Sequence, residues 1–109
     1  METLLRCAYV PKNNKGIEDC ELMEFDSSDI EEYAIEDDEF QILKSAGVFS
    51  AINKRCGVLI EDYEEEIVKG PDVKTSLEVL KTIDPSHKYN FTKAMLAADN
   101  YNTRVDIYF

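Results

Sequence analysis

The alternation of apolar and polar positions predicts three β-strands in this chain. They span residues 4–10, 17–25 and 103–109, because successive side chains of a strand point to its two faces in turn and one face is usually buried. Pro11 ends the first strand, since proline has no N–H to donate to a sheet. The connection between the first two strands is short enough for a hairpin, and we expect the last strand to return beside the first or the second.

Apolar side chains three and four residues apart predict four helices, over residues 36–46, 48–55, 71–83 and 85–99. Gly47 and Gly57 follow the first two of these helices as left-handed caps. Asp84 is expected to cap the start of the last one. The side chains expected on the buried faces of the four helices are Phe40, Leu43, Ala46, Phe49, Ile52, Cys56, Val73, Leu77, Leu80, Ile83, Phe91, Met95 and Ala98.

Two further segments carry weaker local signals. Ser28 stands three residues before Glu31, which is the spacing of a capping box and predicts a short helical turn. Residues 58–68 mix apolar positions with five acids that repel one another. We expect an extended or turn-like segment there, with Tyr63 partly exposed.

The order of elements is strand, strand, several helices, strand. This order predicts an α+β fold, in which a small and mostly antiparallel sheet packs against helices on one face. We expect about three strands, including the N-terminal and C-terminal ones. A chain of 109 residues is expected to form a single domain over residues 1–109, with a core large enough to need no disulfide or metal.

Negative charge is concentrated in two segments. The first acidic block, residues 18–39, holds twelve Asp and Glu residues and no Lys or Arg, and the second, residues 61–66, holds five around Tyr63. The two blocks contain 17 of the 23 acidic residues of a chain whose net charge is -11. This sign argues against direct binding to nucleic acid or to an anionic membrane, where Lys and Arg supply the attraction.

The acidic blocks have two interpretations. Charge runs are usually solvated faces that keep a protein in solution. Here the charge is segregated, and the aromatic residues Phe25, Tyr33, Phe40 and Tyr63 are threaded through it. Acidic residues speed association with a basic protein and aromatic residues anchor it, so we favour a docking surface.

No motif for catalysis or for a cofactor is present in the sequence. Cys7, Cys20 and Cys56 form no C-x-x-C pair, and the single histidine, His87, has polar neighbours typical of a surface position. An EF-hand over residues 26–37 is excluded because Glu31 takes the place of the required glycine. We therefore expect no enzyme, no cofactor and no specific metal site, and leave weak cation binding open. The start of the chain lacks the pattern of a signal peptide, which favours a cytoplasmic protein with reduced thiols.

The middle of the chain resembles the small acidic immunity proteins of bacterial toxin–immunity systems, including those of contact-dependent growth inhibition. The resemblance is one of size and pattern over residues 37–83, and it is carried by the segments 39–43, 45–49, 52–53, 59–66 and 77–80. It implies a protein that is not an enzyme and that binds one cognate toxin domain, often a nuclease, and covers its active site. A nuclease would suit the charge, because its substrate groove is basic.

On this basis we expect the chain to neutralise a basic toxin, and we assign the contact to acidic and tyrosine residues of both blocks. Two other functions stay open: a nucleic-acid mimic that inhibits a restriction or CRISPR enzyme, and an adaptor whose acidic face only keeps it soluble. The residues expected to bind the partner are Asp29, Glu32, Tyr33, Asp37, Asp38, Glu61, Asp62, Tyr63, Glu64 and Glu65.

Overall fold

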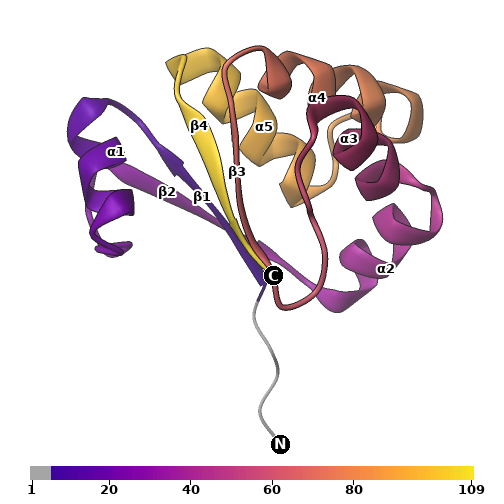
Figure 1. The fold of residues 1–109 in the computed structure, drawn as a ribbon, viewed down its shortest axis with the longest axis horizontal. Coiled ribbons are helices and arrows are strands. Elements are labelled where there is room, and N and C mark those ends of the chain that lie inside the picture. Colours follow the sequence, from indigo (N-terminus) through magenta and orange to yellow (C-terminus); the bar gives the residue numbers. More distant parts are fainter. Residues whose placement is uncertain (1–5) are drawn as a thin grey trace, which may run out of the picture.

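The computed structural model describes residues 6–109, which fold as an α+β domain of five helices and one four-stranded antiparallel sheet (Figure 1). Within this range no helix is long and apolar enough to cross a bilayer. The elements are β1 (Arg6–Pro11), α1 (Asn14–Glu21), β2 (Ile30–Ile35), α2 (Asp37–Ser45), α3 (Val48–Cys56), β3 (Glu65–Lys69), α4 (Pro71–Ile83), α5 (Asn90–Tyr101) and β4 (Arg104–Tyr108).

The sheet has the strand order β2-β1-β4-β3, and every neighbouring pair is antiparallel. β4 lies between β1 and β3, with Ile107 opposite Ala8. The prediction that the last strand returns beside the first is therefore confirmed, and the sheet has one strand more than expected. Residues 4 and 5 of the predicted first strand lie outside the described residues.

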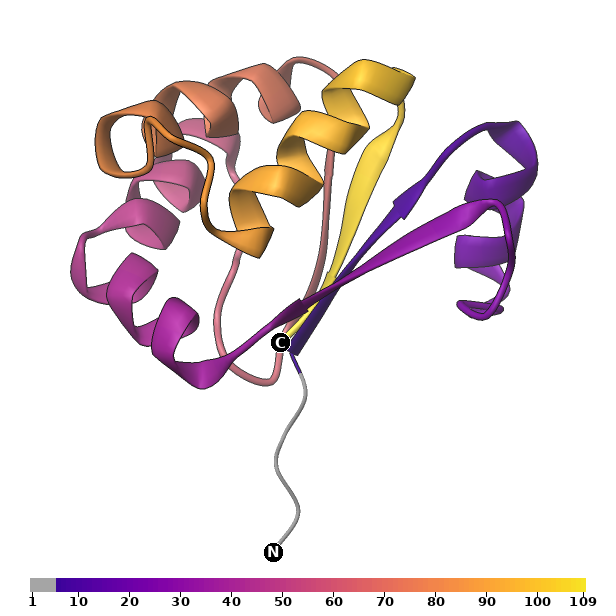
Figure 2. The ribbon, with the colours of Figure 1, turned by 180° about the vertical axis from the view of Figure 1, so that it is seen from behind.

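The core lies between the sheet and helices α2 to α5, which cover one of its faces (Figures 1 and 2). Its centre is aromatic. The ring of Phe49 contacts those of Phe40, Phe91 and Phe109 at centroid distances of 5.3, 5.3 and 5.7 Å. Edge-to-face and tilted packing of this kind adds to the stabilisation that burial alone provides.

The opposite face of the sheet is partly covered by α1 and the turn that follows it (Figure 2). Tyr9 of β1 stacks on Phe25 with ring centroids 4.0 Å apart, and Tyr108 meets Phe25 edge-on at 5.1 Å. Arg104 and Asp106 of β4 are also buried there and form an ion pair of 2.8 Å. The prediction that helices pack over one face is therefore incomplete, because β4 has both faces buried.

The predicted strand over residues 17–25 is wrong. Residues 14–21 form α1, and the Asn13 side chain caps it by accepting the N–H of Gly16. Gly16, Asp19 and Cys20 are buried at helical spacing. A Cβ at Gly16 would lie 2.3 Å from the carbonyl oxygen of Asp29, so this close approach of two backbones requires glycine.

The predicted helical turn at residues 28–31 is also wrong, because β2 begins at Ile30. β1 and β2 pair along six residues each, so the partner of β1 is this segment and the expected hairpin with residues 17–25 does not form. The capping-box spacing has no helix to cap. Pairing with a distant strand outweighs a local signal that stabilises a helix end by about 1 kcal/mol.

The predicted helices are confirmed as α2 to α5, with boundaries that differ by no more than two residues except at the start of α5. α5 begins at Asn90 instead of residue 85. The carboxylate of Asp84 accepts the backbone N–H of Lys88 and of Tyr89, at 2.9 and 3.0 Å, and so holds a loop where a helix start was expected. Segment 58–68 is extended as predicted and ends in β3, while Tyr63 is more exposed than expected, at 78%.

Candidate partner-binding surface

One end of the sheet gathers residues of both acidic blocks. β1 and β3 start there and β2 and β4 end there, because Arg6 lies opposite Ile35 and Tyr108 lies opposite both Cys7 and Glu65. The first turn of α2 follows β2 directly, and the loop of residues 57–64 leads into β3 (Figure 1). We call this region the acidic end, and it consists of Glu36, Asp37, Asp38, Glu61, Asp62, Glu64 and Glu65.

Arg6 holds the two blocks together. Its Nε and Nη2 atoms lie 2.8 and 2.7 Å from Oδ1 of Asp62, and its Nη1 atom lies 3.0 Å from Oδ1 of Asp37. The Arg6 side chain is 10% exposed, against 30% for Asp62 and 66% for Asp37. One buried guanidinium therefore anchors a carboxylate from each block and offsets part of their repulsion.

The guanidinium also rests on an aromatic ring. Its central carbon lies 3.9 Å from the centroid of the Phe40 ring, which is itself buried. The planar cation is thus stacked on a π-face and paired with carboxylates at its edge, an arrangement that suits arginine better than lysine. Phe40 in turn packs on Phe49 and Phe109, so the acidic end is fixed to the centre of the core.

Tyr63 projects from the acidic end. Its backbone φ is 65°, in the left-handed region that costs a residue with a side chain about 1–2 kcal/mol. Backbone bonds to the end of β4 impose this conformation: Tyr63 N–H donates to the carbonyl of Phe109 at 2.8 Å, and Phe109 N–H donates to that of Glu64 at 3.2 Å. The protein thus holds an exposed aromatic ring at a strained position, a combination found at functional sites.

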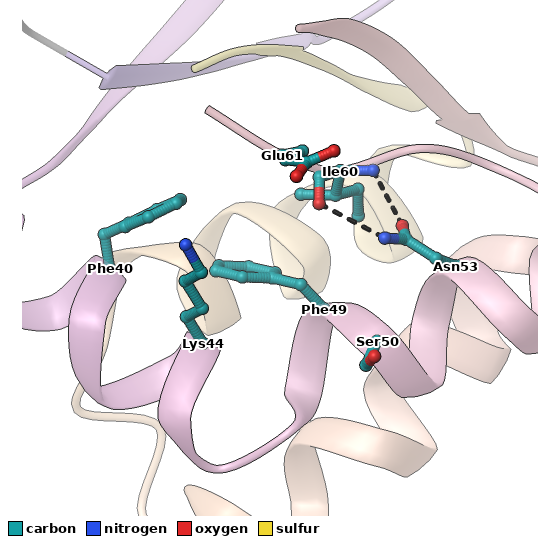
Figure 3. A pocket seen from close by; sticks show the side chains of 7 residues that line it. All are labelled: Phe40, Lys44, Phe49, Ser50, Asn53, Ile60 and Glu61. Atoms are coloured by element: carbon teal, nitrogen blue, oxygen red, sulfur yellow. Dashed lines mark hydrogen bonds between the residues drawn. The ribbon is translucent and has the colours of Figure 1, made fainter. Parts of the chain in front are cut away.

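A hollow of about 320 Å³ opens beside the acidic end, between α2, α3 and residues 60 and 61 (Figure 3). The buried side chains of Phe40, Phe49 and Ile60 form its floor. The side chains at its rim are polar, and they are Lys44, Ser50, Asn53 and Glu61.

The wall of the hollow that carries Glu61 is fixed by the amide of Asn53. Asn53 Nδ2 donates to the carbonyl of Ile60 at 3.2 Å, and Ile60 N–H donates to Asn53 Oδ1 at 2.7 Å (Figure 3). Both ends of the amide are therefore used on one residue of the loop. This pair of bonds sets the position of the neighbouring Glu61 without engaging its carboxylate.

The structure brings together seven of the ten residues predicted to bind a partner. Six of them, Asp37, Asp38, Glu61, Asp62, Glu64 and Glu65, belong to the acidic end, and the seventh, Tyr63, projects from it. Asp37 and Asp62 already contact Arg6, and Glu65 lies on the face of β3 that points away from helices α2 to α5. Their role in binding stays a prediction.

The other three residues lie elsewhere. Asp29 precedes β2 at the opposite end of the sheet and accepts a bond from Asn13, and Glu32 accepts one from the thiol of Cys7. The ring of Tyr33 packs against the core and its hydroxyl donates to Glu31 at 2.7 Å. Burial and this carboxylate raise the pKa of Tyr33 to about 12. Tyr33 is thus partly buried with its hydroxyl already bound to Glu31, and its role in binding a partner stays a prediction.

Sequence reasoning missed Arg6 and the hollow. One signal for Arg6 was available, because it shares a strand face with Ala8 and Val10, which are both fully buried. A charged residue on such a face requires a buried partner of opposite sign. No local signal identifies the hollow, since its lining comes from two helices and a loop.

Comparison with protein families, curated proteins and solved structures found no match. The function is therefore inferred from the chemistry of the molecule. Among residues 6–109, no three His, Cys, Asp or Glu side chains gather as a metal site. Burial raises the pKa of Cys7 and Cys56, and it raises that of Cys20 to about 12, so these thiols stay protonated and unreactive at neutral pH.

Proposed function

We propose that this protein is an immunity protein that binds a cognate basic toxin domain in the cytoplasm and blocks its activity. The acidic end is the contact surface, and a nuclease is the kind of toxin that fits it best. The groove of a nuclease attracts a polyanion, and an acidic protein that fills the groove excludes the substrate.

The observation that carries this proposal is the convergence of the two acidic blocks around Arg6. Charges that serve only solubility need no fixed arrangement. Here a buried arginine holds Asp37 and Asp62 side by side, 25 residues apart in sequence, although acids placed together repel. The strained and exposed Tyr63 lies in the same region. An anionic surface with an aromatic residue in it is the composition expected of an anchor for a basic protein.

The test is to express the tagged chain with the C-terminal domain of the protein encoded immediately upstream. We expect the two to elute as one complex and the chain to restore growth to cells that make the toxic domain. A neighbour that is neither toxic nor bound would overturn the proposal. An immunity protein should also ignore all toxins but its own, whereas a nucleic-acid mimic would be displaced from its enzyme by added DNA.

The surface itself is tested by charge reversal. Replacing Asp38, Glu61 and Glu64 with lysine should abolish rescue and weaken binding at least about a hundredfold, because each contact becomes repulsive. The matched control replaces Glu18, Glu24 and Asp26 with lysine, and these are exposed acids on and after α1. Equal loss of binding in both triple variants would mean that net charge, and not the acidic end, drives association.

A further inference from the structure

We propose that the hollow between α2, α3 and the 57–64 loop is a socket for one arginine side chain of the partner. This inference rests on the proposed function and names the contact through which the acidic end recognises a basic protein. We call the hollow the arginine socket, and its lining is Phe40, Lys44, Phe49, Ser50, Asn53, Ile60 and Glu61.

The size of the hollow fits a side chain. Its volume of about 320 Å³ is at the lower limit of the roughly 300–1,000 Å³ of small-molecule sites. The floor of two phenylalanine rings and one isoleucine offers a flat apolar surface, and Glu61 places a carboxylate at the rim (Figure 3). A guanidinium fits both the apolar floor and the carboxylate of Glu61, because its faces stack on rings and its edge pairs with carboxylates.

The chain already contains one arginine bound in this way. The guanidinium of Arg6 lies 3.9 Å from the centroid of the Phe40 ring and pairs with Asp62, the residue next to Glu61. Phe40 also lines the arginine socket. The Phe40 ring thus contacts both the internal Arg6 and the open socket. The neighbouring carboxylates divide the same two tasks, with Asp62 paired to Arg6 and Glu61 at the socket.

Lys44 stands at the rim of the socket. Its side chain reaches between the rings of Phe40 and Phe49 (Figure 3), with Nζ 5.8 Å from the Phe40 centroid. Lys44 is exposed, and a long flexible side chain can turn out into water when an arginine enters. A cation thus already lies near the Phe40 ring, and a guanidinium from the partner would stack on the rings more closely.

Electrostatics decides against an anionic occupant. Lys44 could pair with a partner carboxylate, but the socket adjoins the acidic end of a chain with net charge -11. The proposed partner is basic, so an arginine is steered toward the socket and a carboxylate is repelled. The bonds from Asn53 to Ile60 fix the backbone next to Glu61, which reduces the backbone ordering required on binding.

The test uses the isolated chain and a blocked arginine, N-acetyl-arginine amide, followed by the backbone amide signals in NMR. We expect the signals of Phe49, Ser50, Ile60 and Glu61 to shift with added probe. N-acetyl-lysine amide should shift them about threefold less, because it lacks the planar face. No shift at these amides, or equal shifts with both probes, would overturn the socket, and shifts with N-acetyl-aspartate amide alone would mean an anion site at Lys44.

Matched variants measure the same contact in the toxin complex. Glu61→Gln should raise the Kd about tenfold, and Glu24→Gln, which removes the same charge from an exposed position outside the acidic end, less than about threefold. Lys44→Met should bind the arginine probe more tightly, with Lys54→Met on the exposed side of α3 as its control. Equal effects of Glu61→Gln and Glu24→Gln would overturn the socket. Co-elution and growth rescue by the unaltered chain test the proposed function separately.

Discussion

At the scale of single residues, Tyr63 places an exposed aromatic ring on the surface at a cost in stability. The ring is 78% exposed and contributes little to the core, while its backbone is held in the left-handed region. Glycine adopts that region without strain. The side chain therefore destabilises the isolated chain, as expected of a residue with the proposed role in binding.

Tyr63→Gly should leave the isolated chain as stable as before or raise its free energy of unfolding by up to about 1 kcal/mol, because relief of strain offsets the entropy of glycine. The same variant should weaken toxin binding at least about tenfold. Urea unfolding and a binding titration measure the two effects, with Tyr63→Ala as the control that removes the ring and keeps the strain. A loss of more than 1 kcal/mol in Tyr63→Gly would show that the ring supports the fold.

At the scale of elements, α2 caps α5. The side chain of Tyr89, the residue that precedes α5, makes no capping hydrogen bond to the first N–H groups of this helix. The carboxylate of Glu39 does so from α2, with Oε1 accepting Asn90 N–H at 3.0 Å and Oε2 accepting Phe91 N–H at 2.8 Å. A carboxylate at a helix N-terminus also interacts favourably with the helix dipole. This contact joins the helix of the acidic end to the last helix of the fold.

Glu39→Ala should lower the free energy of unfolding by about 1–2 kcal/mol, since two N–H groups at the start of α5 lose their acceptor. Asp38→Ala is the matched control, because Asp38 is the neighbouring acid of the same helical turn and is exposed. Urea unfolding of both variants gives the comparison. Equal destabilisation by the two would mean that charge in the first turn of α2, and not the cap on α5, is responsible.

At the scale of the whole molecule, negative charge makes stability depend on pH. Burial raises the pKa of Asp106 above its ordinary value, and the nearby Arg104 offsets only part of this effect. Burial also raises the pKa of Glu39, although its carboxylate accepts two backbone N–H bonds that act in the opposite direction. A raised carboxyl pKa means that the folded state binds protons more tightly than the unfolded chain. The resulting penalty is present at neutral pH and disappears below the ordinary pKa values.

Lowering the pH from 7 toward the ordinary carboxyl pKa values should therefore raise the free energy of unfolding, helped by the smaller net charge. Below the ordinary values of 3.8 for Asp84 and 4.5 for Glu31 the trend should reverse. Backbone N–H bonds to Asp84 and tyrosine hydroxyl bonds to Glu31 outweigh burial and lower the pKa of each. Stability that these carboxylates supply when charged is lost as they take up protons.

Urea unfolding between pH 3 and pH 8 measures this profile. Glu39→Gln should flatten the rise between pH 7 and pH 5, because the variant has no group to protonate there. Glu36→Gln removes the same charge from an exposed position and serves as the control. A stability that is constant or that falls from pH 7 to pH 5 would contradict the expectation.

The sequence by itself determined the helices from residue 37 onward, the first and last strands and the α+β class. In most of these segments the local period agrees with the final burial: Phe91, Met95 and Ala98 are spaced for one helix face, and Val105 and Ile107 for one strand face. Ala46 and Ile83, which were also expected on buried helix faces, are exposed. The acidic composition and the candidate residues of the second block are likewise properties of contiguous sequence.

Tertiary structure alone decided the region from residue 13 to residue 35. Local alternation over residues 17–25 favoured a strand, but Asn13 caps a helix there, and residues 30–35 pair with β1 instead. The formation of α1 in place of a strand also buries the second face of the sheet, because α1 and Phe25 then lie over Tyr9 and β4.

Tertiary structure also assembled the candidate site. Arg6 meets Asp37 and Asp62, residues 31 and 56 positions away, because β1 lies between strands that come from both halves of the chain. The hollow likewise takes its lining from two helices and a loop. Periodicity compares a residue only with its neighbours along the chain. Contacts of this kind depend on strand order and on which faces are covered, so they are set only when the whole domain packs.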